Sequence, residues 1–265
     1  MLRSGGERTG SEIGPVPGTM MKQPISFHPL LIGSGGLSAH LHEYFTLTGV
    51  PHEVLKDSRK LSGLETILAQ ASKTGPFSHF WLLVSDDALP ALSRHLNDRY
   101  PEIPQIHSSA ATSLPGAVTL HPLMSFGPTL YSLSVYESFP FVLIEEESKT
   151  APGFEALIRT TFKNRMFKIK GCDRERYHLN CSMISNLSVL LWSAAMKAGP
   201  GLEIEWFIPI LEQTLKNFGT SGESALTGPL ARGDQITLNR HLNTLKGLPE
   251  HGLYKAFMEY YADRS

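Results

Sequence analysis

The segment HPLLIGSGGLSAHL, residues 28–41, constrains the possible folds of this chain more than any other segment. A short apolar run ends in the turn GSGG, and apolar residues at helical spacing follow it directly. This order of strand, glycine turn and helix is typical of the first unit of a nucleotide-binding α/β fold. Ser38 stands where the usual fingerprint has a third glycine, so the turn needs support from the rest of the chain.

That support comes from an alternation of apolar runs and helix-like segments that continues to about residue 169. Strands are expected at 27–33, 52–56, 79–85, 103–109, 116–122 and 139–146, and helices at 37–49, 61–72 and 86–100. Asp86 or Asp87 is expected to cap the third of these helices. Because buried strands separated by helices form parallel sheets covered on both faces, we predict a doubly wound α/β domain of Rossmann type over residues 23–169.

The pattern changes after residue 170, where helical segments follow one another without strands. Helices are expected at 173–198, 202–219, 234–247 and 248–264, with a glycine-rich connection over 219–233. Pro209 is a candidate kink in the second of them, and Asp234 is well placed to cap the third. We therefore predict an all-helical C-terminal domain over residues 170–265. Residues 1–22 are rich in Gly, Ser, Pro and Thr and are expected to be disordered.

Composition narrows the functional classes. The net charge is -1, from 24 basic and 25 acidic residues, so neither nucleic acid nor an anionic membrane is an expected partner. No apolar stretch approaches the roughly 18 residues of a membrane span. The two cysteines, Cys172 and Cys181, would lie roughly 13 Å apart on one helix, too far for a disulfide, which favours a reducing, cytoplasmic location. No Cys-x-x-Cys or His-Glu-x-x-His pattern indicates a metal, and no Gly-x-Ser-x-Gly pattern indicates a hydrolase.

The glycine turn is expected to hold the pyrophosphate of a dinucleotide. Gly33 permits the tight turn, and Gly35 lets the backbone approach the pyrophosphate at the N-terminus of the helix. Val84 and Ser85, at the end of the third strand, are expected to line the same crevice. The complete set of residues expected around the cofactor at these two strands is Gly33, Ser34, Gly35, Gly36, Leu37, Val84 and Ser85.

The end of the second strand bears on the choice between NAD and NADP. The sequence there is KDSRK, residues 56–60. Ser58 and Arg59 can donate hydrogen bonds to a 2′-phosphate, which favours NADP. Asp57 could instead accept from a ribose 2′-hydroxyl, as in enzymes that use NAD. An ordinary exposed charged loop is the structural alternative.

Several segments taken together resemble a known family. They are LLIGSGGLSAHL, VLKDSRK, LLVSDDAL, IHSSAA, TLHPLMSF, YHLNCSMISN and ALTGPLARGD, in that order along the chain. They are similar to Rossmann-like oxidoreductases of undefined physiological role, related to the pyrroline-5-carboxylate reductases and the ketopantoate reductases. The resemblance implies an NADP-binding domain, and a helical domain like that of the 6-phosphogluconate dehydrogenases. It also implies pairing of two subunits through the helical domain, hence a homodimer, and an active site between the domains.

Two strand ends carry candidate catalytic histidines. His107 and Ser109 stand at the end of the fourth strand, where they would face the nicotinamide end of the crevice, with His107 as general acid. The alternative for His107 is a strand-end histidine bonded to backbone. His121 stands in HPLMSF after the next strand and is a candidate substrate contact, or simply shapes the loop.

The helix expected at 173–198 carries a polar row of His178, Ser182 and then Ser185 or Asn186. The resemblance implies that this helix supplies the proton donor or the substrate anchor, for which His178 and Asn186 are the candidates. Helix-packing hydrogen bonds are the alternative.

Two further features of this half of the chain bear on the chemistry. No lysine occurs between residues 176 and 197, which disfavours the mechanism of the 3-hydroxy-acid dehydrogenases. Arg232 could bind a substrate carboxylate or pair across a dimer interface.

These features predict an NADP-dependent reductase or dehydrogenase. It would transfer hydride to the C=N or C=O bond of a small substrate that carries a carboxylate. One alternative is a sensor or interaction module that binds NADP(H) without turnover. The other is an α/β interaction protein whose crevice binds no nucleotide.

Overall fold

The computed structural model describes residues 27–57, 63–74, 76–145, 154–199 and 201–264. The predicted disorder of residues 1–22 lies outside these ranges. The chain divides into two compact units between Cys172 and Asp173. The sequence pattern places the same change between residues 169 and 170.

The first unit is built on a sheet whose described strands follow the order β2-β1-β3-β4-β5-β6-β7. The strands are β1 (Pro29–Ile32), β2 (Glu53–Leu55), β3 (His79–Leu82), β4 (Gln105–His107), β5 (Ala117–Pro122), β6 (Phe141–Glu145) and β7 (Met166–Lys170). All neighbours pair in parallel except β5 and β6, which are antiparallel. The prediction of an entirely parallel sheet was therefore wrong at one pair, and β7 was not predicted.

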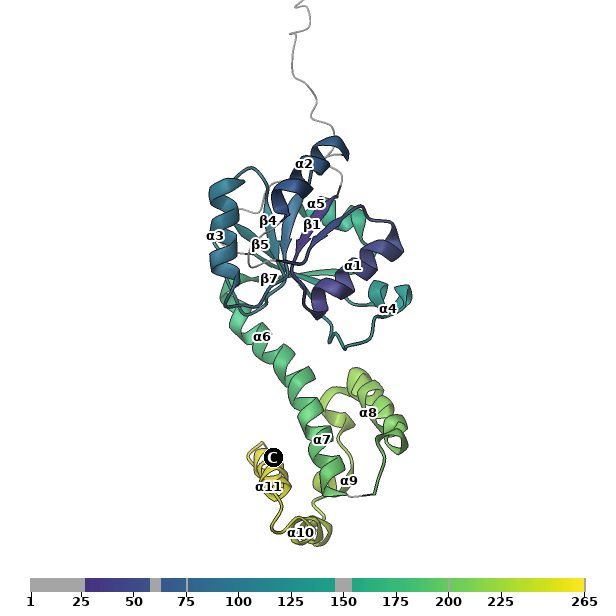
Figure 1. The fold of residues 1–265 in the computed structure, drawn as a ribbon. Coiled ribbons are helices and arrows are strands. Elements are labelled where there is room, and N and C mark those ends of the chain that lie inside the picture. Colours follow the sequence, from purple (N-terminus) through teal and green to yellow (C-terminus); the bar gives the residue numbers. More distant parts are fainter. Residues whose placement is uncertain (1–26, 58–62, 75, 146–153, 200, 265) are drawn as a thin grey trace, which may run out of the picture. The chain divides into compact units, whose positions relative to one another are not determined.

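Helices cover both faces of this sheet (Figure 1). They are α1 (Gly36–Thr48), α2 (Leu64–Thr74), α3 (Leu89–Arg99), α4 (Leu133–Ser138) and α5 (Phe154–Thr161). Leu31 of β1 packs in a core cluster with residues of α1, α4 and α5. Leu30 and Ile32 point to the other face and pack with residues of α2 and α3. Because each β1 side chain is buried on one face or the other, the strand is a continuous apolar run, and the predicted Rossmann-like α/β fold is confirmed.

The predicted cap of helix α3 was wrong. The helix begins at Leu89 after Ala88, and no side chain caps it. The backbone N–H groups of Ala88 and Leu89 both donate to the carbonyl of Ser85, at 3.0 and 3.2 Å. This extra turn separates Asp86 and Asp87 from the helix terminus and leaves both side chains exposed.

The second unit is helical throughout its described residues. A single helical run contains α6 (Arg174–Ser182), the π-helical turn η2 (Met183–Leu187) and α7 (Ser188–Ala198), which confirms the long helix predicted at 173–198. The remaining helices are α8 (Ile208–Ser221), α9 (Gly228–Arg232), α10 (Gln235–Thr244) and α11 (Glu250–Ala262), with short 3-10 turns at Gly171–Asp173, Ile204–Trp206 and Gly222–Ala225. Pro209 lies in the first turn of α8, where its missing N–H costs nothing, so the predicted kink was wrong.

The predicted cap at Asp234 is confirmed. Its Oδ1 accepts a 3.1 Å hydrogen bond from the backbone N–H of Thr237, and its Oδ2 accepts one of 2.7 Å from the Thr237 hydroxyl. These bonds stabilise the carboxylate and hold the pKa of Asp234 below its ordinary value. The side chain thus fixes the start of α10.

The helical unit buries few of its side chains. Among its described residues only Arg174 and Leu238 are buried. The helical run Gly171–Ala198 spans 28 residues, reaches a mean hydropathy of 1.3 over an 18-residue window and buries none of that window. It is long and apolar enough to cross a membrane by those two measures alone, which corrects the expectation that no such stretch exists. A core helix of a soluble protein passes the same test.

Candidate functional site

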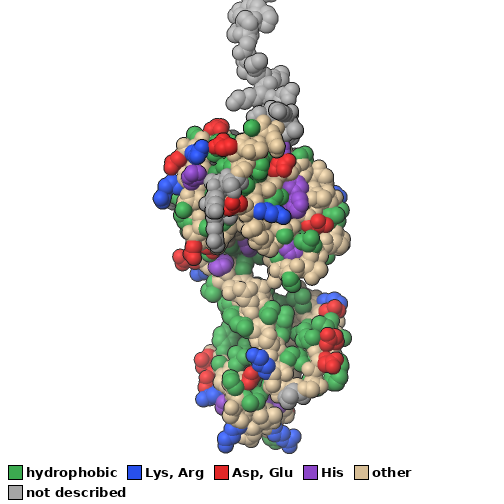
Figure 2. Space-filling model, viewed as in Figure 1, with side chains coloured by type: hydrophobic (Ala, Val, Ile, Leu, Met, Phe, Trp, Pro, Cys, Tyr) green, Lys and Arg blue, Asp and Glu red, His purple; other side chains and the backbone are tan. Residues whose placement is uncertain are grey.

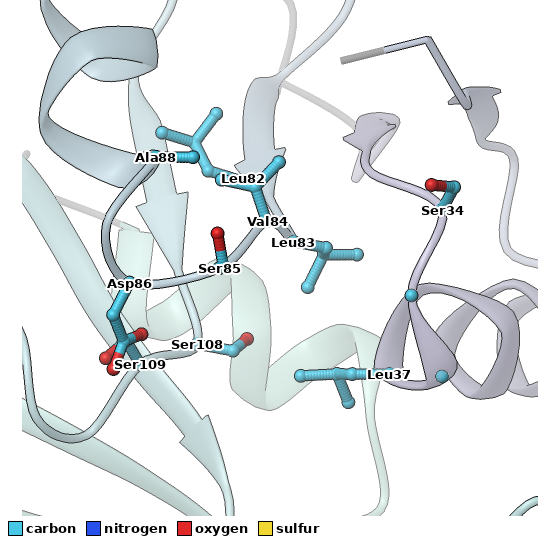
Figure 3. Close-up of a pocket in the computed structure, with 12 residues that line it drawn as sticks. Ser34, Leu37, Leu82, Leu83, Val84, Ser85, Asp86, Ala88, Ser108 and Ser109 are labelled. Carbon is cyan, nitrogen blue, oxygen red and sulfur yellow. The ribbon is translucent and has the colours of Figure 1, made fainter. Parts of the chain in front are cut away.

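A pocket of about 530 Å³ lies where β1, β3 and β4 end (Figure 3). Strand β2 lies on one side of β1 and β3 on the other, so the chain reverses its direction of winding at this point. Ligands of open α/β sheets bind at such a switch point, outside the carboxyl ends of the strands. The pocket is lined by Ser34, Gly35, Gly36, Leu37, Leu82, Leu83, Val84, Ser85, Asp86, Ala88, Ser108 and Ser109.

The turn after β1 requires glycine at residue 33. Gly33 has a φ of +153° and donates its N–H to the carbonyl of Leu55 at 3.0 Å. A Cβ built there would lie 2.1 Å from the carbonyl oxygen of Leu83. Gly33 therefore lets three neighbouring strand ends approach one another closely.

Ser38 explains why the chain can lack the third glycine of the fingerprint. Its side chain is buried, and its hydroxyl donates a 2.9 Å hydrogen bond to the carbonyl of Gly33. This bond ties helix α1 to the end of β1, which is the close contact that the third glycine usually permits. The small size of serine was anticipated from the sequence, but the hydrogen bond was not.

Gly35 and Gly36 have a different environment. A Cβ at either residue would meet no other atom within 4 Å. Gly35 precedes the first turn of α1, where no side chain caps the helix and no acidic residue is present. The first N–H groups of a helix have no partner within the helix and carry the positive end of its dipole. Gly36 and Leu37 of this first turn line the pocket, so the site fits an anionic pyrophosphate.

The ends of β3 and β4 supply the opposite wall. Ser108 is buried and accepts a 2.8 Å hydrogen bond from the indole N–H of Trp81. Ser109 accepts one of 3.1 Å from the backbone N–H of Thr112. These bonds hold both hydroxyl groups at the pocket. Val84 and Ser85 lie in the lining, where the sequence predicts them.

The location of His107 argues against its predicted role as proton donor. The side chain is fully buried, and its Nε2 lies 2.9 Å from the Thr119 hydroxyl on the neighbouring strand. His107 is not among the residues that line the pocket, and its role as proton donor stays a prediction. His121 is half-buried on β5 and is not among the residues that line the pocket.

The candidates in the helical unit lie on the long helical run. His178 and Asn186 are exposed, and Ser182 is half-buried. The Ser185 hydroxyl lies 2.8 Å from both the Cys181 carbonyl and Asn186 Oδ1.

The π-helical turn shifts Asn186 relative to the regular four-residue spacing that the sequence prediction assumed, and such turns are frequent at functional sites. Arg232 is exposed at the end of α9. The roles of these residues stay predictions.

The residues predicted to select NADP are only partly described. Ser58 and Arg59 lie outside the described residues. Asp57 is exposed two residues after β2, on the side of β1 where the adenosine ribose binds in dinucleotide-binding folds.

His40, on the helix that follows the glycine turn, is a buried residue that the sequence analysis did not single out. His40 of α1 is buried, with Nε2 2.8 Å from the carbonyl of Gly127 and Nδ1 2.9 Å from the Tyr136 hydroxyl. Because a carbonyl only accepts, Nε2 carries the hydrogen and Nδ1 accepts from Tyr136. His40 thus anchors the segment after β5 to the helix that begins at the phosphate turn.

Comparison with known proteins supports this fold. Residues 140–261 match the family described as a domain of unknown function, DUF2520. A search of the curated proteins gives no match. A protein of Bacteroides fragilis, named as an NADP oxidoreductase, is 18% identical with a TM-score of 0.70, over 90% of this chain and 98% of its own.

Two further solved structures extend the comparison. A Thermotoga maritima protein is 21% identical with a TM-score of 0.64, over 89% of this chain and 97% of its own. The pyrroline carboxylate reductase of Plasmodium falciparum, solved with NADP bound, is 9% identical with a TM-score of 0.54, over 90% of this chain and 96% of its own. At these identities the likeness shows that the chain has the fold of these proteins.

Proposed function

We propose that this protein is an NADP-dependent oxidoreductase that reduces the C=N or C=O bond of a small, carboxylate-bearing substrate. The observation that carries the proposal is the pocket at the switch point of the sheet, with an uncapped helix N-terminus and two glycines that leave its wall open. Similar structures named as an NADP oxidoreductase and a pyrroline carboxylate reductase with NADP bound support the choice of cofactor and reaction class.

The residues that this proposal involves divide into those that bind the cofactor and those that act on the substrate. The backbone N–H groups after Gly35 bind the pyrophosphate, and Arg59 with Ser58 binds the 2′-phosphate. Ser109 lies at the end of β4, where it orients the substrate by hydrogen bonding. When bound, NADPH supplies the hydride. Of the two candidate proton donors we favour His178, since His107 is buried and does not line the pocket.

The choice of NADP over NAD is tested by titration of the purified protein with NADPH and with NADH. We expect NADPH to bind more tightly, and Arg59→Ala to weaken NADPH binding about tenfold or more while NADH binding changes little. Arg94→Ala, which removes an exposed arginine of α3, is the matched control and should bind both nucleotides like the wild type. Equal binding of both nucleotides by the wild type would contradict the assignment of NADP. Binding without turnover of any imine or keto acid would indicate a sensor.

We further propose that the helical unit pairs with the same unit of a second copy. Large apolar side chains are exposed along α6, η2, α7 and α8, among them Ile184, Leu190 and Leu215. Figure 2 shows hydrophobic side chains gathered over this unit. Exposed apolar area on this scale marks an interaction surface. With one buried apolar residue, Leu238, the described part of the unit lacks the core that would offset the entropy of ordering it.

This pairing predicts a mass in solution of twice 29.2 kDa, measured by light scattering. Leu190→Glu should shift the protein toward the monomer, because it places a charge in the apolar contact. Leu47→Glu, which changes an exposed leucine of the first unit, should leave the mass unchanged. A monomeric wild type, or one recovered only with membranes or detergent, would contradict the proposal.

A further inference from the structure

The side chain of Asp86 has no structural role in the described part of the molecule that accounts for its position. It lines the pocket, it is exposed, and it does not cap helix α3. Its carboxylate has no hydrogen-bond or ion-pair partner among the described residues. The other residues that line the pocket are glycine, serine or apolar. Among the described lining residues, Asp86 is therefore the one that carries a charge.

The topology of the sheet indicates which end of the ligand Asp86 meets. In dinucleotide-binding folds the pyrophosphate binds at the turn after the first strand, and the adenosine extends toward the second. Here β2 and β3 lie on opposite sides of β1, so the nicotinamide half extends toward β3 and β4. In Figure 3 Asp86 and Ser109 lie across the pocket from Ser34 and Leu37. Asp86 therefore lies on the side of the pocket toward which the nicotinamide half of a dinucleotide would extend, across from the turn that would hold the pyrophosphate.

We propose that Asp86 is a specificity-determining residue that selects a substrate with a positively charged nitrogen at the reacting end. This inference rests on the proposed function. A carboxylate only accepts hydrogen bonds, and it binds a charged N–H donor more strongly than a neutral one. A ketone presents lone pairs to the same carboxylate and is disfavoured. The structure thus favours a protonated imine over a carbonyl compound.

The reaction of a protonated imine is balanced with the groups available. The imine nitrogen takes up one proton before reduction. Its carbon then accepts the hydride, and the π electrons of the C=N bond return to nitrogen. The amine forms without charge, the cofactor leaves oxidised, and the amine then takes up a proton from water, as piperidine does at pH 8.

The proposal is tested with piperidine, which is a cation at pH 8, and its neutral analogue tetrahydropyran. Each is titrated by calorimetry into the protein saturated with NADPH. We expect the wild type to bind the cation about tenfold more tightly than the neutral compound. Asp86→Asn should abolish this preference, whereas Asp87→Asn, which removes the adjacent exposed carboxylate outside the pocket lining, should retain it.

Three results would overturn the role of Asp86. They are a wild type without the preference, an equal loss in both variants, and a loss of NADPH affinity in Asp86→Asn, which would place the carboxylate against the cofactor. In the first two, NADPH still binds the wild type, so the proposed function stands. A wild type that binds no NADPH overturns the proposed function itself, and the role of Asp86 with it.

Discussion

Replacing Gly33 by alanine should prevent stable folding, whereas the same change at Gly35 should leave the fold intact. The new Cβ at residue 33 would lie 2.1 Å from a backbone carbonyl oxygen, in a backbone conformation that residues with side chains rarely adopt. Strands β1 and β3 would have to separate to accommodate it. We expect a loss of more than about 4 kcal/mol in the free energy of unfolding, or no soluble protein.

Gly35→Ala is the matched control for this change. Its Cβ meets no protein atom within 4 Å, and the φ of Gly35, -78°, suits alanine. Glycine is the better N-cap of the two, so the free energy of unfolding should fall by no more than about 1 kcal/mol. Chemical denaturation of the two variants and the wild type measures both effects. A Gly33→Ala variant as stable as the wild type would contradict the close approach described for this turn.

The second large effect concerns the stability of the protein in mild acid. His79 on β3 is fully buried, and burial, with a smaller contribution from the nearby charge of His28, lowers its pKa to about 3. The unfolded chain has the ordinary pKa of about 6.5 and so binds a proton that the folded protein excludes. The stabilising difference is fully present above pH 6.5 and is lost progressively as the pH falls toward 3. Between pH 7 and pH 5 this single group should cost about 2 kcal/mol.

A variant that cannot titrate isolates this effect. His79→Gln should lose less stability than the wild type between pH 7 and pH 5, by about the same 2 kcal/mol. His95→Gln, which removes an exposed histidine of α3, should follow the wild type. Urea denaturation at the two pH values provides the comparison. If His79→Gln and the wild type lost stability equally, His79 would not be the neutral buried group described here.

The sequence predicts the first half of the sheet well, for a physical reason. Strands β1 and β3 are buried on both faces, so all their residues but His79 are apolar. The turn after β1 needs glycine at residue 33, which the sequence shows directly. Strand β7 leaves no such trace, because it lies at the sheet edge with its residues exposed or half-buried. The direction of β6 relative to β5 could not be predicted either, since a run of apolar residues is compatible with a parallel or an antiparallel strand.

The candidate site was predictable in its position and less so in its details. The ends of β1, β3 and β4 were located correctly by the apolar runs. An aspartate before a helix is most often a cap, and only the extra turn at Ser85 frees Asp86 to line the pocket. The burial of His107 was not predicted, because a place at the end of a strand does not show which neighbours will cover the side chain. The π-helical turn at η2 has no sequence signal that spacing rules detect.

The central claim is that the pocket after β1 holds the pyrophosphate of NADPH. Calorimetric titration of NADPH into the wild type and Gly35→Ala, both shown to be folded, tests it most directly. Because the alanine methyl group would occupy the open wall next to the helix N-terminus, we predict tight binding by the wild type and affinity at least about tenfold weaker in the variant. Equal affinity in the two folded proteins, or no binding to either, would contradict the claim.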